Sequence, residues 1–102
     1  MDICFWSAVR IAEAIRAKNI SATEVVSEHL ARIEATSGPI NAVVQVVAER
    51  ALDEARQADA LTVQGKSMGP LHGVPITIKD SLDSAGIVST GGTAGRIRFI
   101  PE

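Results

Sequence analysis

The chain has 102 residues, 46% of them hydrophobic and 22% charged, so its length allows at most one small domain or part of a larger one. The net charge is −2 at pH 7 and the sequence has no basic run, which leaves binding to nucleic acid or to an acidic membrane without electrostatic support. The apolar stretches are shorter than a bilayer span, the N-terminus has no basic region, and a single cysteine excludes an internal disulfide; we therefore expect a cytoplasmic protein without a membrane segment.

Two helices are predicted in the first part of the chain. Ser7 can cap a helix over residues 7–18, where apolar residues recur at helical spacing and Asn19 is a plausible stop. A second helix, over residues 21–36, begins with a capping box in which Ser21 and Glu24 can satisfy each other's backbone amides. Gly38-Pro39 is expected to end it.

The sequence from residue 41 onward predicts two strands and a third helix. Residues 41–47 are rich in β-branched side chains and indicate a short strand, and residues 48–61 return to helical spacing. A loop follows, and residues 74–79 are predicted to form a second strand. The sequence then becomes rich in glycine and stops after Pro101-Glu102, a pair typical of the beginning of a helix that would continue further.

The most informative stretch of the chain is the segment Gly69-Pro-Leu-His-Gly-Val-Pro-Ile-Thr-Ile-Lys79-Asp80. A lysine at the end of an apolar strand is a candidate for burial, and burial lowers the pKa of a lysine from about 10.4 toward values at which it can act as a base. Strand alternation places Val74, Ile76 and Ile78 on one face and Lys79 on the other, with Asp80 pointing away from Lys79. In an arbitrary sequence, however, a Lys-Asp pair of this kind is usually a surface feature at the end of a strand.

Other residues offer weaker chemistry. Histidines 29 and 72 are isolated; His29 fits a structural role beside an apolar stripe, and His72 is a weak candidate for a ligand or an acid-base group. No group of histidine, cysteine and carboxylate residues has metal-ligand spacing, so we expect no metal and no cofactor. Hydroxyl groups near Lys79 in sequence are more often turn residues than nucleophiles; they are Ser81, Ser84, Ser89, Thr90 and Thr93.

The segment from Gly69 to Asp80, together with Ser89-Thr-Gly-Gly-Thr93 and Phe99-Ile-Pro-Glu102, strongly resembles the amidase signature family. The upstream helices are similar as well, so the resemblance covers nearly the whole chain. It implies an α/β fold, of which this chain would hold the N-terminal helices and the first strands of a mixed sheet, incomplete. It also implies hydrolysis of carboxylic amides by a Ser–cis-Ser–Lys triad, with Lys79 as the catalytic lysine and both serines beyond Glu102.

Three interpretations follow from this resemblance. The chain is expected to be part of an amidase acting on a small-molecule amide substrate, inactive alone and working with a complementary downstream polypeptide. It can instead be a non-catalytic assembly module that self-associates through unpaired sheet edges. It can also belong to a glutamine-hydrolysing amidotransferase, as one of its subunits, although residues 80–95 slightly favour the free-standing amidase.

Overall fold

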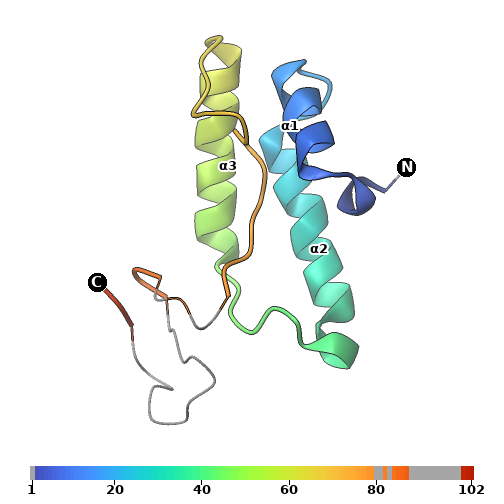
Figure 1. The fold of residues 1–102 in the computed structure, drawn as a ribbon, viewed down its shortest axis with the longest axis vertical. Helices are drawn as coiled ribbons and strands as arrows, with labels where there is room; N and C mark the ends of the chain where they lie inside the picture. The colour runs from blue at the N-terminus through green and yellow to red at the C-terminus, as the bar shows by residue number, and fades with distance from the viewer. Residues whose placement is uncertain (1, 80–81, 83, 88–99) are drawn as a thin grey trace.

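The computed structural model describes residues 2–79, 82, 84–87 and 100–102. A short 3-10 helix (η1, Ile3–Phe5) precedes the α-helices α1 (Ala8–Arg16), α2 (Ala22–Ile40) and α3 (Ala48–Val63). Figure 1 shows α2 and α3 running antiparallel, with α1 beside the end where α2 begins and α3 finishes. The described residues contain no strand, so this part of the chain is helical.

Helix α1 has the predicted cap at its start and a left-handed residue at its end. The Ser7 hydroxyl accepts the Arg10 amide at 3.1 Å. The helix ends at Arg16 and not at Lys18, because Lys18 adopts φ of 62°. The amides of Lys18 and Asn19 then return to the carbonyls of Ile15 and Ala14, each at 3.0 Å, which is the hydrogen-bond pattern of a Schellman motif.

Helix α2 begins where the capping signal predicts and extends further than expected. The Ser21 hydroxyl accepts the Glu24 amide at 3.0 Å, which confirms the first half of the predicted capping box. The helix continues through Gly38 and Pro39 to Ile40. Proline is tolerated there because it removes a single backbone donor in the last turn of the helix. Asn41, with φ of 50°, closes the helix by donating its amide to the Ser37 carbonyl at 2.8 Å.

A carboxylate on α3 joins the second half of that helix to the start of α2. The Asp59 carboxylate accepts the Ala22 amide at 2.7 Å, the Thr23 amide at 3.0 Å and the Thr23 hydroxyl at 2.6 Å. Burial raises the pKa of Asp59, but the hydrogen bonds from Thr23 and Ala22 outweigh it, so the pKa lies below its ordinary value. Asp59 and Ser21 therefore satisfy the first three amides of α2, which a helix cannot satisfy by itself.

The core is built from small and medium aliphatic side chains, in a sequence of which only 3% is aromatic. It lies at one end of the molecule, where α1, the start of α2 and the second half of α3 meet (Figure 1). The buried residues are Ile11, Ala12, Ile15, Ala22, Val25, Val26, Ala55 and Ala58. Partly buried side chains, among them Trp6, Leu52 and Val74, pack around this group.

The N-terminal turn, η1, packs on α2. The Cys4 thiol donates to the Glu28 carbonyl at 3.6 Å, and the Arg32 guanidinium lies 5.4 Å from the centre of the Phe5 ring. Burial raises the pKa of the Cys4 thiol, and the Asp2 carboxylate raises it further. A thiol with a raised pKa is a poor nucleophile, which agrees with a structural role for Cys4.

The two predicted strands are not confirmed. Residues 41–47 connect α2 to α3, and residues 74–79 run away from the core, but neither segment is assigned as a strand. A strand requires a neighbouring backbone with which to form a hydrogen-bonded ladder, and the described residues supply no such partner. The helical part of the predicted α/β arrangement is present here, whereas its sheet stays a prediction.

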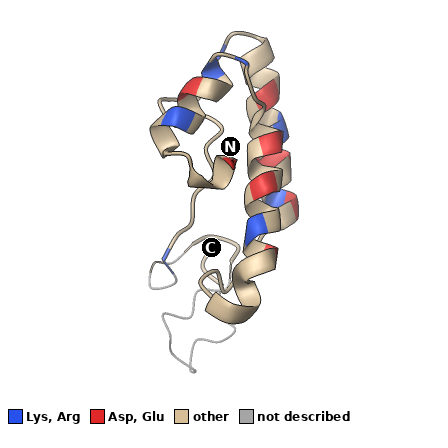
Figure 2. Ribbon diagram, turned by 90° about the vertical axis from the view of Figure 1, so that its right-hand side faces the viewer, with Lys and Arg blue, Asp and Glu red and all other residues tan. Residues whose placement is uncertain are grey.

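The helices carry charges of both signs along their exposed faces (Figure 2). The exposed ion pairs Arg50–Glu54 and Arg56–Asp53 both lie on α3, at 3.1 and 2.8 Å. In contrast, residues 41–47 and 74–78 contain no charged side chain. Among the described helices, none is long and apolar enough to cross a lipid bilayer.

Candidate active-site segment around Lys79

The segment that carries Lys79 starts from a glycine pressed against the core. Gly73 adopts φ of 82°, and a Cβ built on it would lie 2.9 Å from Ile15 Cδ1 and 3.0 Å from Ala22 Cβ. Both the backbone conformation and the close approach require glycine at this position. The next residue, Val74, packs against the core, so the chain is firmly held at the point where it turns toward Lys79.

Lys79 lies on the wall of an apolar hollow of about 750 Å³. The hollow is lined by one side of α2, the connection between α2 and α3, and the segment leading to Lys79, together with Ala51 of α3 and with Leu82, Ser84 and Ile87 after the lysine. Val26, Leu30 and Ile33 line it from α2. Lys79 is the single Lys or Arg among the described lining residues, and none of those residues is a carboxylate. The described wall therefore surrounds Lys79 with mainly apolar side chains and no carboxylate.

The expected burial of this segment is incomplete. Ile76 is 73% exposed, Ile78 is 55% exposed, and Lys79 is exposed as well. Alternation should place Val74, Ile76 and Ile78 on one buried face, but Val74 alone packs against the core. Without a neighbouring strand or covering layer among the described residues, the segment has no second surface to bury its side chains. The desolvation that a lysine base needs is not supplied by this part of the chain.

The two histidines are held by main-chain groups. The Nδ1 atom of His29 lies 2.8 Å from the Val25 carbonyl in the preceding turn of α2, although His29 also lines the hollow. The ring of His72 contacts the main chain through both nitrogens, at Met68 and at Ala58. These contacts favour structural roles for both residues. They do not bring either histidine into a hydrogen bond with Lys79.

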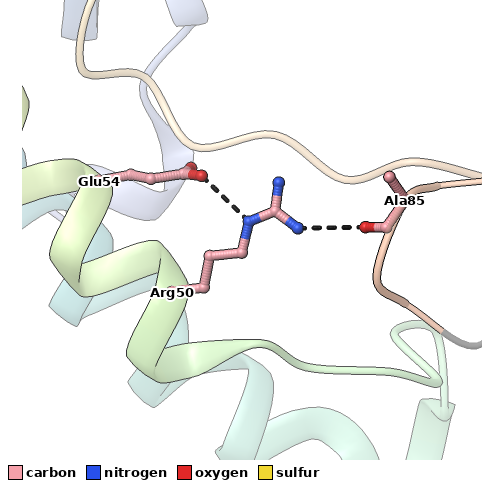
Figure 3. Close-up of polar contacts among 3 residues, drawn as sticks. All are labelled: Arg50, Glu54 and Ala85. Carbon is pink, nitrogen blue, oxygen red and sulfur yellow. Dashed lines mark hydrogen bonds and ion pairs between the residues drawn. The ribbon is translucent and has the colours of Figure 1, made fainter. Parts of the chain in front are cut away.

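The residues that follow Lys79 are tied back to α3. The Leu82 amide donates to the Lys79 carbonyl at 2.9 Å. Arg50 lies between Glu54 Oε1, at 3.1 Å from its Nε, and the Ala85 carbonyl, at 3.4 Å from its Nη1 (Figure 3). The next amide along the chain, that of Gly86, donates to the Pro101 carbonyl at 2.9 Å. The segment is thus anchored to the helices both before and after Lys79.

The neighbouring hydroxyl groups and the acidic residue next to Lys79 are described only in part. Ser84 lines the same hollow as Lys79, and its carbonyl accepts the Ile87 amide at 3.2 Å in a turn. The remaining positions predicted around Lys79 lie outside the described residues; they are Asp80, Ser81, Ser89, Thr90 and Thr93. Across the described ranges, no group of three or more His, Cys, Asp or Glu side chains could hold a metal ion.

Sequence reasoning missed three residues that fix this region. Asp59 and Arg50 carry no local signal of these contacts, because their partners are 35 to 37 residues away in the sequence. His72 had no local signal that would distinguish a loop histidine from one bound to a helix. Gly73 did have a signal: a glycine directly before an apolar run often marks a close approach of the backbone.

Comparison with known proteins identifies the family. The sequence model of the amidase family matches residues 24–102, which include nearly all of α2, the whole of α3 and the segment leading to Lys79. The chain belongs to the amidase family. This match confirms the resemblance to the amidase signature family that was based on the segment from Gly69 to Asp80.

The relatives of this amidase-family chain include two kinds of protein. It is 42% identical to the A subunit of glutamyl-tRNA(Gln) amidotransferase from Carboxydothermus hydrogenoformans, over 99% of this chain and 21% of that protein. It is 43% identical to the indoleacetamide hydrolase of Bradyrhizobium diazoefficiens, over 93% of this chain and 18% of that protein. The chain thus spans about a fifth of the length of these curated relatives, and the similarity does not separate the two kinds.

Proposed function

We propose that this chain is the part of an amidase that supplies Lys79 as the base in the hydrolysis of carboxylic amides. The observation that carries the proposal is the position of Lys79: it ends an apolar segment of an amidase-family chain, on the wall of a hollow with no carboxylate among the described lining residues. The serines of the Ser–cis-Ser–Lys arrangement belong to residues outside this sequence.

The chemistry requires the neutral amine of Lys79. In a site closed to water, this amine accepts the proton of the nucleophilic serine, relayed by the bridging serine, while the serine oxygen attacks the amide carbon. The proton then passes to the departing nitrogen, which leaves as ammonia or an amine. Water hydrolyses the resulting ester and regenerates the serine. Because Lys79 is exposed in the described part of the chain, further polypeptide must cover it before it can work in this way.

The test is made on an amidase that contains residues 1–102 together with the implied serines, in one chain or in two. Ammonia release from indoleacetamide and from glutamine measures turnover. We expect Lys79→Ala and Lys79→Arg to lower kcat by roughly 10²- to 10⁴-fold, the usual contribution of a general base. Lys66→Ala, which alters an exposed lysine in the loop before the segment, is the matched control and should keep full turnover. Turnover by Lys79→Ala equal to that of the control would overturn the proposal.

The 102-residue polypeptide by itself is expected to release no ammonia above background, because the members of a catalytic triad act as a unit. Hydrolysis by this polypeptide that disappears in Lys79→Ala would contradict that expectation. The assay therefore includes the isolated chain beside the complete amidase.

A second candidate function is supported by the relatives that are amidotransferase subunits. In this alternative, Lys79 acts on glutamine and the released ammonia is transferred onward. The two substrates of the assay separate the candidates: a clear preference for glutamine over indoleacetamide supports the amidotransferase, and the reverse supports the free-standing amidase. A cytoplasmic location and association with a further polypeptide are parts of the same proposal.

A further inference from the structure

The imidazole of His72 connects the loop after α3 to α3 itself through both ring nitrogens. Its Nδ1 accepts the Met68 amide at 3.0 Å. A ring that accepts at Nδ1 carries its proton on Nε2 when it is neutral, and Nε2 lies 2.9 Å from the Ala58 carbonyl. The Thr62 hydroxyl, 2.9 Å from Nε2, donates to the same carbonyl at 3.0 Å. The ring is therefore fixed in one orientation and one tautomer.

These contacts leave His72 no nitrogen for proton transfer with a substrate. Both of its polar atoms are directed at main-chain groups, and the ring is half-buried against α3. His72 is therefore a poor candidate for an acid-base group or a ligand. Through these contacts, the ring determines the path of the surrounding loop.

That path leads directly to Lys79. The His72 and Val74 amides close successive turns on the carbonyls of Gly69 and Leu71, at 3.1 and 3.0 Å. Gly73, between them, packs against Ile15 and Ala22. The turn is consequently fixed to α3 on one side, through His72, and to α1 and α2 on the other, through Gly73.

Among the described residues, no hydrogen bond joins residues 75–78 to a helix. Pro75 restricts its own φ and has no amide hydrogen with which to form such a bond. The direction in which the segment approaches Lys79 is therefore set where it begins, at His72 and Gly73, while the Arg50–Ala85 contact holds the chain after the lysine. A small rotation at the beginning is carried along residues 75–78 to the lysine.

We propose that His72 is a positioning residue for Lys79: by bridging the Met68 amide and the Ala58 carbonyl, it holds the turn from which the lysine-bearing segment departs. This inference rests on the proposed role of Lys79 as the base. A misplaced base slows the chemical step and leaves substrate binding nearly unchanged, because errors of about 1 Å in a catalytic group can cost on the order of 10²-fold in rate.

The experiment uses the same complete amidase and measures kcat and KM per folded molecule, with the folded fraction taken from circular dichroism at the assay temperature. His72→Ala is expected to lower kcat roughly 10- to 100-fold while KM stays within about twofold. His72→Asn keeps an acceptor for the Met68 amide, and His72→Gln keeps a donor for the Ala58 carbonyl. Each should restore part of the lost kcat, and they remain informative if His72→Ala does not fold.

Ser67→Ala is the matched control. Ser67 holds the same loop by bonds to Gly69, at 3.0 and 3.1 Å, and shares the Gly69 carbonyl with the His72 amide, but it makes none of the hydrogen bonds of the His72 ring. If His72 only stabilised the fold, His72→Ala would lower the folded fraction, as Ser67→Ala does, and would leave kcat per folded molecule unchanged. Unchanged kcat in all three His72 variants, or an equal fall in Ser67→Ala, would overturn the inference. Lys79→Ala is measured in parallel: if it retains turnover, the proposed function itself fails, and if it alone is inactive, only the role of His72 fails.

Discussion

At the scale of single residues, three side chains or backbone positions decide how the helices and the Lys79 segment fit together. Asp59 joins α3 to the start of α2, His72 joins the following loop to α3, and Gly73 brings the next turn against α1 and α2. The partners of Asp59 are 36 and 37 residues away in the sequence. No local pattern reveals such partners, which is why the sequence predicts the loop before residues 74–79 but not the role of Asp59.

Replacing Asp59 should show how much this connection contributes. Asp59→Ala removes the acceptor for two amides and one hydroxyl, and we expect it to lower the free energy of unfolding by about 2 kcal/mol. Asp59→Asn should lose less, since it keeps one acceptor oxygen. Urea denaturation followed by circular dichroism measures both. Asp53→Asn, an exposed residue of α3, is the control and should change the value by no more than about 0.5 kcal/mol.

The contribution of Asp59 also depends on pH in a defined direction. Its pKa is lower in the folded chain than in the unfolded one, so its stabilisation is complete above the unfolded pKa of about 3.9 and is lost as the pH falls through the folded value. The difference in stability between the parent chain and Asp59→Asn should therefore shrink below about pH 4. A difference that stays constant down to about pH 2 would contradict the charged hydrogen bonds as its source.

At the scale of elements, the sequence predicted the helices, whereas the predicted strands were not confirmed. Both results depend on where the backbone hydrogen-bond partners lie. A helix satisfies its hydrogen bonds within its own sequence, so local signals such as Ser7 and the Ser21 cap locate its start. Its end is less certain: α2 continues through Pro39, and α1 stops before the left-handed Lys18. A strand satisfies its hydrogen bonds on another strand, so the β-branched residues 41–47 and 74–79 express a tendency that a partner must complete.

The Ser21 cap provides a test at this scale. Ser21→Ala removes the side-chain acceptor of the Glu24 amide at the start of α2, and we expect the free energy of unfolding to fall by about 1 kcal/mol. Ser27→Ala, on the exposed side of the same helix, should be neutral or slightly stabilising because alanine favours helix. Thermal unfolding of the two variants makes the comparison. Equal stability of both would mean that Asp59 alone satisfies the start of α2.

At the scale of the whole molecule, the two ends of the helical pair differ. One end holds the buried core, the Asp59 connection and the His72 turn. The other end holds the hollow beside Lys79 and apolar side chains that stay exposed, among them Val44, Ile76 and Ile78. The radius of gyration is 15.0 Å, larger than the value of about 13 Å expected for a compact domain of this length. Stability should therefore come from the packed end, while the Lys79 end contributes little.

Substitutions at the two ends test this asymmetry. Ile15→Ala, in the core, should lower the free energy of unfolding by about 2–5 kcal/mol. Ile76→Ser and Ile78→Ser, at exposed positions beside the hollow, should change it by no more than about 0.5 kcal/mol. Chemical denaturation of the 102-residue chain gives all three values. A loss at Ile76 comparable to that at Ile15 would show that the segment is buried in solution and would contradict the asymmetry.

The sequence by itself determined where the helices begin, the importance of the segment from Gly69 to Asp80 and, through that segment, the amidase family. These properties depend on local patterns, which act over a few residues. Only the tertiary structure decided which charges join elements, which histidine holds the Lys79 turn, and which apolar residues are buried. Those outcomes depend on contacts between residues far apart in the chain, such as Asp59 with Thr23, and such contacts exist only once the helices have packed.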